Sequence, residues 1–189
     1  FVKKKFSSYL SISLKLNHHI RIATSDDLPS IMEVIADAKQ LLKESGSPQW
    51  QDSDGYPNEQ TFLNDISLNQ LYVCINKDNN QVIGVVVISK IPDECYNKIT
   101  NGQWLSNQPY YVIHRLAARK GFHVGYELIN YAKQKAKQDN ISSVRADTMD
   151  INIPMRKLLS KCGFSHCGTI ILERCACSDP RRMAFEILL

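Results

Sequence analysis

The chain has 189 residues, of which 43% are hydrophobic and 22% are charged, and its formal net charge is +4. This length and composition are typical of one globular domain and exclude a disordered or fibrous chain. The small charge excess does not indicate a nucleic-acid surface, and no apolar run approaches the roughly 18 residues of a membrane-spanning helix.

Residues 1–18 differ in character from the rest. Lysines at 3, 4 and 5 precede a stretch in which serines and a lysine interrupt the hydrophobic residues. A secretory signal peptide has a continuous apolar core and then a small-residue cleavage site. We therefore interpret residues 1–18 as an N-terminal extension and residues 19–189 as a single domain.

The domain begins with a predicted strand and two predicted helices. His19–Ala23 forms the strand, and Thr24 with Asp27 gives the capping-box pattern that opens a helix ending at Gly46. A loop over residues 47–58 precedes a second helix at Glu59–Leu68. These elements are followed by strands.

Two strands, Leu71–Ile75 and Val82–Ile88, are predicted on either side of a polar turn. The second strand is apolar on both faces, so we expect it in the centre of a sheet. After an irregular stretch over residues 92–109, strands alternate with helices: Tyr110–Ala117, a helix from Val124 to about Asp139, Ser143–Thr148, a helix from Asn152 to Gly163, Ser165–Leu172 and Arg182–Leu188. The order predicts an α/β fold with a mixed sheet and helices on both faces.

The segment after Ala118 carries the strongest chemical signal. Arg119, Lys120 and Gly121 form a short basic loop between a strand and a helix. Such a loop presents backbone N–H groups together with the positive end of a helix, which suits a phosphate or pyrophosphate. An ordinary strand–helix connection has the same pattern. A Rossmann dinucleotide site is disfavoured, because its glycine-rich turn follows the first strand.

Ordered motifs on both sides of this loop resemble the GNAT superfamily of N-acetyltransferases, from about Ile20 to the C-terminus. They are Trp50, Gly55-Tyr56-Pro57, His114-Arg115-Leu116-Ala117, Gly121 and Gly125, Asp147-Thr148, Asn152, and Lys161-Cys162-Gly163-Phe164. The resemblance implies a GNAT-like acyl-CoA N-acyltransferase fold whose sheet splays between its fourth and fifth strands. It implies an acetyl-CoA-dependent N-acetyltransferase that moves an acetyl group to a primary amine of a small molecule or peptide by direct attack.

The same resemblance assigns the acetyl-CoA site. The cofactor-binding residues it implies are Leu116, Ala117, Ala118, Lys120, Gly121, His123, Val124, Gly125, Tyr126 and Asn152. The sequence also departs from the family: the loop is shorter than usual, His123 replaces a small residue, and Leu159 replaces a Tyr that often protonates the leaving thiolate. These departures leave an alternative open, a GNAT-fold binding module with weak or no CoA binding and no catalysis.

His114 is the candidate catalytic residue, because its side chain titrates near neutral pH and the implied thioester lies beside its strand. A purely structural histidine is the alternative. Strand alternation predicts that His114 shares a face with Val112 and Leu116 and that Arg115 points to the other face. We expect Arg115 to pair with Asp147 or, failing that, to bind an acidic substrate.

The loop over residues 47–58 is expected to cover the acceptor. Trp50 and Tyr56, with Asp52 and Asp54, suit a cationic amine, and the alternative is that the two aromatic residues only anchor the loop. The expected partner is a small-molecule or peptide amine; no nucleic-acid or membrane partner is expected, and the protein is expected to be a monomer or homodimer.

The cysteines indicate the compartment. They lie at positions 74, 95, 162, 167, 175 and 177, and their spacing does not match a zinc site. A domain of this size does not need disulfides for stability. We therefore expect reduced thiols, a cytoplasmic protein and no bound metal.

Overall fold

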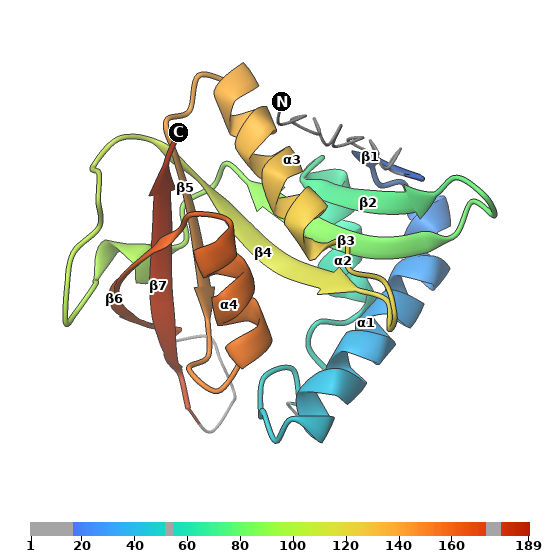
Figure 1. Cartoon of the computed structure of the whole chain (residues 1–189), viewed down its shortest axis with the longest axis horizontal. Helices are drawn as coiled ribbons and strands as arrows, with labels where there is room; N and C mark the ends of the chain where they lie inside the picture. Colours follow the sequence, from blue (N-terminus) through green and yellow to red (C-terminus); the bar gives the residue numbers. More distant parts are fainter. Residues whose placement is uncertain (1–16, 52–54, 173–178) are drawn as a thin grey trace, which may run out of the picture.

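The computed structural model describes residues 17–51, 55–172 and 179–189. Seven strands form one open mixed sheet in the order β1-β2-β3-β4-β5-β7-β6 (Figure 1). The strands are β1 His18–Ile22, β2 Leu71–Asn76, β3 Val82–Ser89, β4 Tyr110–Ala118, β5 Ser143–Thr148, β6 Ser165–Ile171 and β7 Arg181–Leu188. Neighbouring strands are antiparallel except β4 and β5, which are parallel. The predicted mixed sheet is confirmed.

Helices cover both faces of the sheet, as predicted. They are α1 Leu28–Glu44 and α2 Glu59–Ser67 on one face, α3 Gly125–Gln138 and α4 Ile153–Lys161 on the other, and the short 3-10 turns η1 Ser25–Asp27 and η2 Glu94–Asn97 (Figure 1). One hydrophobic core lies between the sheet and α3 and α4, and a second lies between the sheet and α1 and α2. Every residue of β3 is buried, which confirms its central place.

The start of the first helix follows its sequence signal closely. Thr24 and Asp27 form the expected capping box, and a single 3-10 turn precedes α1. Arg21 donates to both Asp27 carboxylate oxygens, at 2.7 and 2.8 Å. Strand β1 begins at His18, one residue earlier than predicted, and residues 1–16 of the expected extension lie outside the described chain.

The irregular stretch over residues 92–109 is anchored to the β5–β7 half of the sheet. The Arg145 guanidinium lies 4.1 Å from the ring centre of Trp104 and 3.7 Å from that of Tyr110. Its Nε donates to the buried carboxylate of Glu186 at 3.0 Å. The same carboxylate accepts from the Leu105 N–H at 2.6 Å, and the Trp104 Nε1 donates to the Tyr96 carbonyl, so the segment and η2 are held against the sheet.

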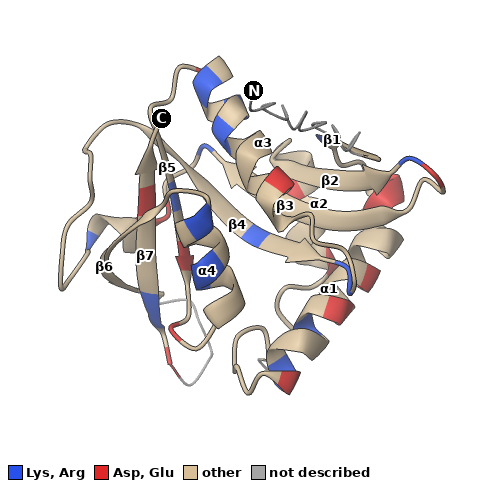
Figure 2. Cartoon of the chain, in the orientation of Figure 1, with Lys and Arg blue, Asp and Glu red and all other residues tan. Residues whose placement is uncertain are grey.

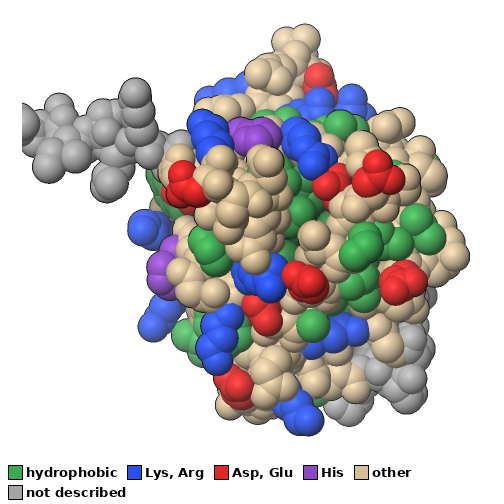
Figure 3. Space-filling model, turned by 90° about the vertical axis from the view of Figure 1, so that its right-hand side faces the viewer, with side chains coloured by type: hydrophobic (Ala, Val, Ile, Leu, Met, Phe, Trp, Pro, Cys, Tyr) green, Lys and Arg blue, Asp and Glu red, His purple; other side chains and the backbone are tan. Residues whose placement is uncertain are grey.

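The charged side chains do not gather into one surface. Helix α1 carries both acidic and basic residues, and Arg119 of the β4–α3 loop lies next to the acidic residue Glu33 of α1 (Figure 2). On the face shown in Figure 3, side chains of both signs are interspersed with small hydrophobic areas. In the part of the chain that the structure describes, no helix has the length and apolar character needed to cross a membrane.

Candidate active site

A cavity opens at a fork between β4 and β5. The two strands pair from Tyr110–Ser143 to Ile113–Ala146 and no further. Beyond that point, β4 continues beside β3 to Ala118, and β5 continues beside β7 to Thr148. The strands therefore separate, and the backbone groups on the inner edge of β4 lose their sheet partner.

The cavity in this fork has a volume of about 700 Å³. Elements from both halves of the sheet line it: Ala38, Leu41, Leu42 and Ser45 of α1; Gln49, Trp50 and Tyr56 of the next loop; Ile113–His123 of β4 and its loop; Gly125 and Tyr126 of α3; Asp147 and Thr148 of β5; Asn152 and residues 154, 155, 158 and 161 of α4; and Leu172 and Arg182. Of the predicted site residues that the structure describes, all lie in this lining except Val124, which is buried.

A β-bulge in β4 changes the predicted orientation of its side chains. Val85 pairs with Ala117 and Val87 with His114, so two residues of β4 lie opposite one residue of β3. Arg115, the first of these two, has a positive φ of 49°. The extra residue moves Leu116 to the α3 face, where it packs against the core there. The prediction that Leu116 shares a face with His114 is wrong, because regular alternation fails at a bulge.

His114 lies at the point where the fork opens, one residue beyond the last β4–β5 pair. Its side chain is 14% exposed, and its Nε2 lies 3.7 Å from a carboxylate oxygen of Asp93. The ring stacks on that of Tyr96, with ring centres 6.4 Å apart. The side chain is therefore held in place on two sides and still lines the cavity.

Tyr96 links this group to the other strand of the fork. Its hydroxyl donates to Asp147 at 2.6 Å. Burial, and then the neighbouring Asp147 carboxylate, raise the pKa of Tyr96 well above its ordinary value, so the phenol stays a neutral donor. Asp147 is the first β5 residue beyond the last β4–β5 pair, so each strand contributes a titratable side chain at the same level. The sequence did not indicate Tyr96, because it lies in a segment without periodicity.

Arg115 has a different partner from the one predicted. Its guanidinium binds Asp65 of α2 through two hydrogen bonds, at 2.8 and 2.7 Å, and donates to the Tyr56 hydroxyl at 2.9 Å. Both charged side chains are nearly buried. The expected Arg115–Asp147 pair is wrong, because the bulge directs Arg115 toward α2 and Asp147 binds Tyr96.

The β4–α3 loop is tied to α1. Arg119 forms an ion pair with Glu33 at 2.8 Å, and the backbone N–H of Lys120 donates to Asp37 at 3.1 Å. Gly121 has a φ of +87°, a conformation that favours glycine. The charge of Arg119 is thus offset by an acidic residue of α1, and the Lys120 N–H already donates to Asp37. Of the backbone N–H groups predicted to donate to the pyrophosphate, those after Lys120 remain as candidates.

The start of α3 is open toward the cavity. Its N-cap residue, Val124, has no side chain that caps the first turn. A Cβ on Gly125 would lie 2.8 Å from Leu158, so the glycine lets α3 approach α4 closely. Lys161 of α4 lies 5.5 Å from the ring centre of Tyr126. Uncapped N–H groups and a cation at one mouth of the cavity form an arrangement that suits a phosphate.

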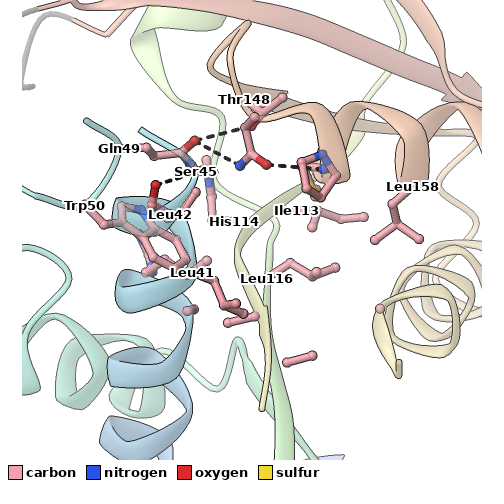
Figure 4. A pocket seen from close by; sticks show the side chains of 18 of the residues that line it. Leu41, Leu42, Ser45, Gln49, Trp50, Ile113, His114, Leu116, Thr148 and Leu158 are labelled. Carbon is pink, nitrogen blue, oxygen red and sulfur yellow. Dashed lines mark hydrogen bonds between the residues drawn. The ribbon is translucent and has the colours of Figure 1, made fainter. Parts of the chain in front are cut away.

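Asn152 and Gln49 join the two sides of the cavity. The Asn152 Oδ1 accepts from the N–H of Met155 at 3.2 Å and so caps α4, as predicted. Its Nδ2 donates to Gln49 Oε1 at 3.1 Å, and the Thr148 hydroxyl donates to the same oxygen at 3.4 Å (Figure 4). Gln49 thus connects the α1–α2 loop to the far strand. No pattern in the sequence indicates this contact between residues that are far apart in the chain.

Trp50 and Tyr56 lie where the loop covers the cavity. Trp50 has a φ of 61° and packs against the core under α1, and it lines the cavity beside Leu41 and Leu42 (Figure 4). Asp52 and Asp54 lie outside the described residues. Among the residues that the structure does describe, no three His, Cys, Asp or Glu side chains are placed to hold a metal ion.

Comparison with known proteins gives a consistent result. A model described as the acetyltransferase (GNAT) family matches residues 35–164. A GNAT-family acetyltransferase from Streptococcus agalactiae is 28% identical, with 91% of this chain and 95% of that chain covered and a TM-score of 0.79. A putative acetyltransferase from Staphylococcus aureus Mu50 is 27% identical, with 89% and 97% covered and a TM-score of 0.67. No curated protein matches.

Proposed function

The chain belongs to the acetyltransferase (GNAT) family, and on this premise we propose that it transfers the acetyl group of acetyl-CoA to a primary amine of a small molecule or peptide by direct attack. The observation that carries the proposal is the fork. The pairing of β4 and β5 ends at Ile113 and Ala146, and a cavity of about 700 Å³ opens there between the two halves of the sheet.

The residues around the fork fit acetyl-CoA. The uncapped first turn of α3 and the side chain of Lys161 would hold its phosphates. The end of β4 at residues 116–118 lines the fork beyond the last β4–β5 pair and would hold the extended arm, and Asn152 would lie near the thioester. When bound, acetyl-CoA supplies an activated acyl group with a thiol leaving group.

The chain's own contribution is to handle a proton and to place the amine. A protonated amine has no lone pair, so a nearby base favours attack. His114 is the group proposed for this role, because it lies at the opening of the fork and its ring is held by Asp93 and Tyr96. Leu159, which replaces the usual tyrosine acid, is fully buried in the core under α3. The thiolate therefore leaves without an acid from this position.

Two measurements test the proposal. Calorimetry with acetyl-CoA should give saturable binding, and an assay of thiol release should detect turnover with at least one primary amine. The assay should follow product by chromatography as well, because the protein carries cysteines of its own. Saturable binding with no turnover on a broad amine panel would contradict the proposed activity.

The alternative, a binding module with weak or no CoA binding, is favoured by one observation. The Asp37 carboxylate accepts the Lys120 N–H within the loop expected to hold the pyrophosphate, and a nearby negative charge disfavours a phosphate. Asp37→Asn keeps the hydrogen-bond acceptor and removes the charge. Asp37→Asn should tighten acetyl-CoA binding under either proposal. The wild-type protein separates them: under the enzyme proposal it binds acetyl-CoA saturably and turns over an amine, whereas under the alternative it binds weakly or not at all and shows no turnover.

A further inference from the structure

The cavity has two walls of different character. On the α1 side, Leu41, Leu42 and Trp50 face the cavity, and Leu158 of α4 lies across from them (Figure 4). The basic residues and uncapped helix turn described above belong to the β4–α3 loop and α4. Since phosphates require that second side, the α1 side is left for the acyl acceptor.

The polar groups on the α1 side already have hydrogen-bond partners within the protein. The Ser45 hydroxyl donates to the Leu42 carbonyl at 2.7 Å, and the Gln49 carboxamide oxygen accepts from Thr148 and Asn152. The Tyr56 hydroxyl accepts from Arg115. Because these polar groups have partners, mainly carbon atoms on this side are left to contact the part of the acyl-acceptor substrate that lies beyond its amine.

The charge on this side is also balanced. Arg115 lines the cavity, but its guanidinium makes two hydrogen bonds to Asp65, and both side chains are nearly buried. An acidic acceptor would have to compete with a carboxylate that is already in place. A second charged group on the acceptor would be transferred from water to an apolar wall, which is unfavourable without a partner.

We propose that the preferred acceptor is a small primary amine carrying a single apolar group, an alkylamine or arylalkylamine, and that Leu41, Leu42 and Trp50 form its binding wall. This inference rests on the proposed function and adds the substrate class. The amine would lie toward His114 at the opening of the fork, and the apolar group would lie along α1. Specificity then comes from apolar contact with the tail of the substrate.

Three acceptors of equal chain length separate this proposal from its competitors. Hexylamine, 1,6-diaminohexane and 6-aminohexanoate present nearly the same reacting amine and differ at the far end, which is apolar, cationic or anionic. We expect hexylamine to have the highest kcat/KM, by roughly a hundredfold or more over 6-aminohexanoate, and propylamine to be at least roughly tenfold poorer than hexylamine. Equal rates, or a preference for either charged acceptor, would overturn the inference.

Charge substitutions at Leu41 test the wall itself. This side chain is 41% exposed, so a polar replacement should be tolerated in folding. Leu41→Glu should shift preference toward 1,6-diaminohexane and Leu41→Lys toward 6-aminohexanoate, each by up to roughly fivefold, the ceiling for a partly exposed ion pair. Leu63→Glu is the matched control, because Leu63 is similarly exposed, at 37%, and does not line the cavity. A shift in the control as large as that at Leu41 would contradict the assignment.

Binding measurements separate the two proposals. If no amine is turned over, calorimetry of the same three acceptors in the presence of CoA still measures selectivity for the apolar one. Selective hexylamine binding without turnover would reject the proposed activity and support the apolar wall. Turnover without apolar preference would reject the wall and support the activity, and neither binding nor turnover would reject both.

Discussion

Arg115 lies at the β-bulge of β4 and has a positive φ. A positive φ is uncommon for a long side chain, and here it marks an extra residue in the strand. The bulge separates the directions of His114 and Leu116, and it sends the guanidinium to Asp65 and Tyr56. The bulge therefore determines both the direction of the candidate base, His114, and the position of the Arg115 guanidinium between α2 and the α1–α2 loop.

The Arg115–Asp65 pair gives a test of this geometry by stability. Arg115→Met should reduce the free energy of unfolding by about 3–5 kcal/mol, because it leaves the buried Asp65 carboxylate without its partner. Asp65→Leu in the same chain should recover most of the loss, as measured by urea unfolding. The matched control combines Arg115→Met with Asp147→Asn, and those two effects should add. Coupling to Asp147 in place of Asp65 would contradict the observed pairing.

His114 gives a test by kinetics. His114→Gln should lower kcat/KM at neutral pH by roughly 10²–10⁴, the usual contribution of a general base. The loss should diminish toward pH 10, where a larger fraction of the amine substrate is neutral. Initial rates from pH 6 to 10 check this, with acetyl-CoA affinity as the control, since it should change little. A pH-independent loss would indicate a structural histidine.

At the scale of elements, the close approach of α3 to α4 shapes the opening of the cavity at which the first turn of α3 and Lys161 lie. Gly125 allows this approach, because any side chain there would meet Leu158. A glycine at the start of this helix is therefore favoured by packing, and the proposed phosphate contact would give a second reason for it.

Gly125→Ala should reduce the free energy of unfolding by about 1–3 kcal/mol, the usual cost of overpacking, and should weaken acetyl-CoA binding. Leu158→Ala makes room for the new methyl group, so the two substitutions should show favourable coupling in a double-mutant cycle. Urea unfolding and a binding isotherm measure the two effects. Leu63→Ala, on the opposite face of the sheet, should simply add to Gly125→Ala.

The stability of the start of α1 should depend on pH, because the Asp27 carboxylate accepts hydrogen bonds there. The hydrogen bond from Arg21 is the largest effect on this carboxyl and outweighs burial, so its pKa lies below the ordinary 3.8. The unfolded chain then binds more protons than the folded chain at acidic pH. The stabilisation is therefore complete above pH 3.8 and is lost as the pH falls through the folded-state pKa.

Asp27→Asn should lower the free energy of unfolding by about 1–2 kcal/mol at pH 7, through the weakened cap and charged hydrogen bonds. The difference from wild type should shrink as the pH falls below 3.8. Urea unfolding at several pH values measures it. Asp26→Asn, an exposed acidic residue of the same turn, is the control and should have little effect at any pH.

At the scale of the whole molecule, the sheet has two halves, β1–β4 and β5–β7, which are joined by a short stretch of β4–β5 pairing. Four residue pairs join β4 to β5, and Gln49 adds one side-chain link across the fork. A ligand that fills the fork contacts both halves at once. Binding should therefore raise the free energy of global unfolding, because the ligand contacts both halves of the sheet and not one loop alone.

Acetyl-CoA at about one hundred times its Kd should stabilise the protein by about 2.7 kcal/mol. For a chain of this size, the corresponding rise in Tm is about 5–10 °C. A thermal unfolding series against ligand concentration measures this rise. Gly125→Ala should need more ligand for the same rise, and a wild-type Tm that is independent of ligand would contradict cofactor binding in the fork.

The sequence alone determined the order of the strands and α-helices and placed their bounds to within a few residues, because periodicity, caps and glycines act over short distances along the chain. Its ordered motifs also identified the family, and all the predicted site residues that the structure describes, except Val124, line the cavity. It did not show which residues meet across the fold. The bulge at Arg115, the Asp65 pairing, the Tyr96–Asp147 contact and the Gln49 link were decided by the tertiary structure, because each joins segments whose separation in the chain hides their proximity. The proposed acceptor wall was also decided by the tertiary structure. From the sequence, Leu41 and Leu42 are ordinary residues of a helix, and only the folded chain places β4, α4 and the cavity beside them.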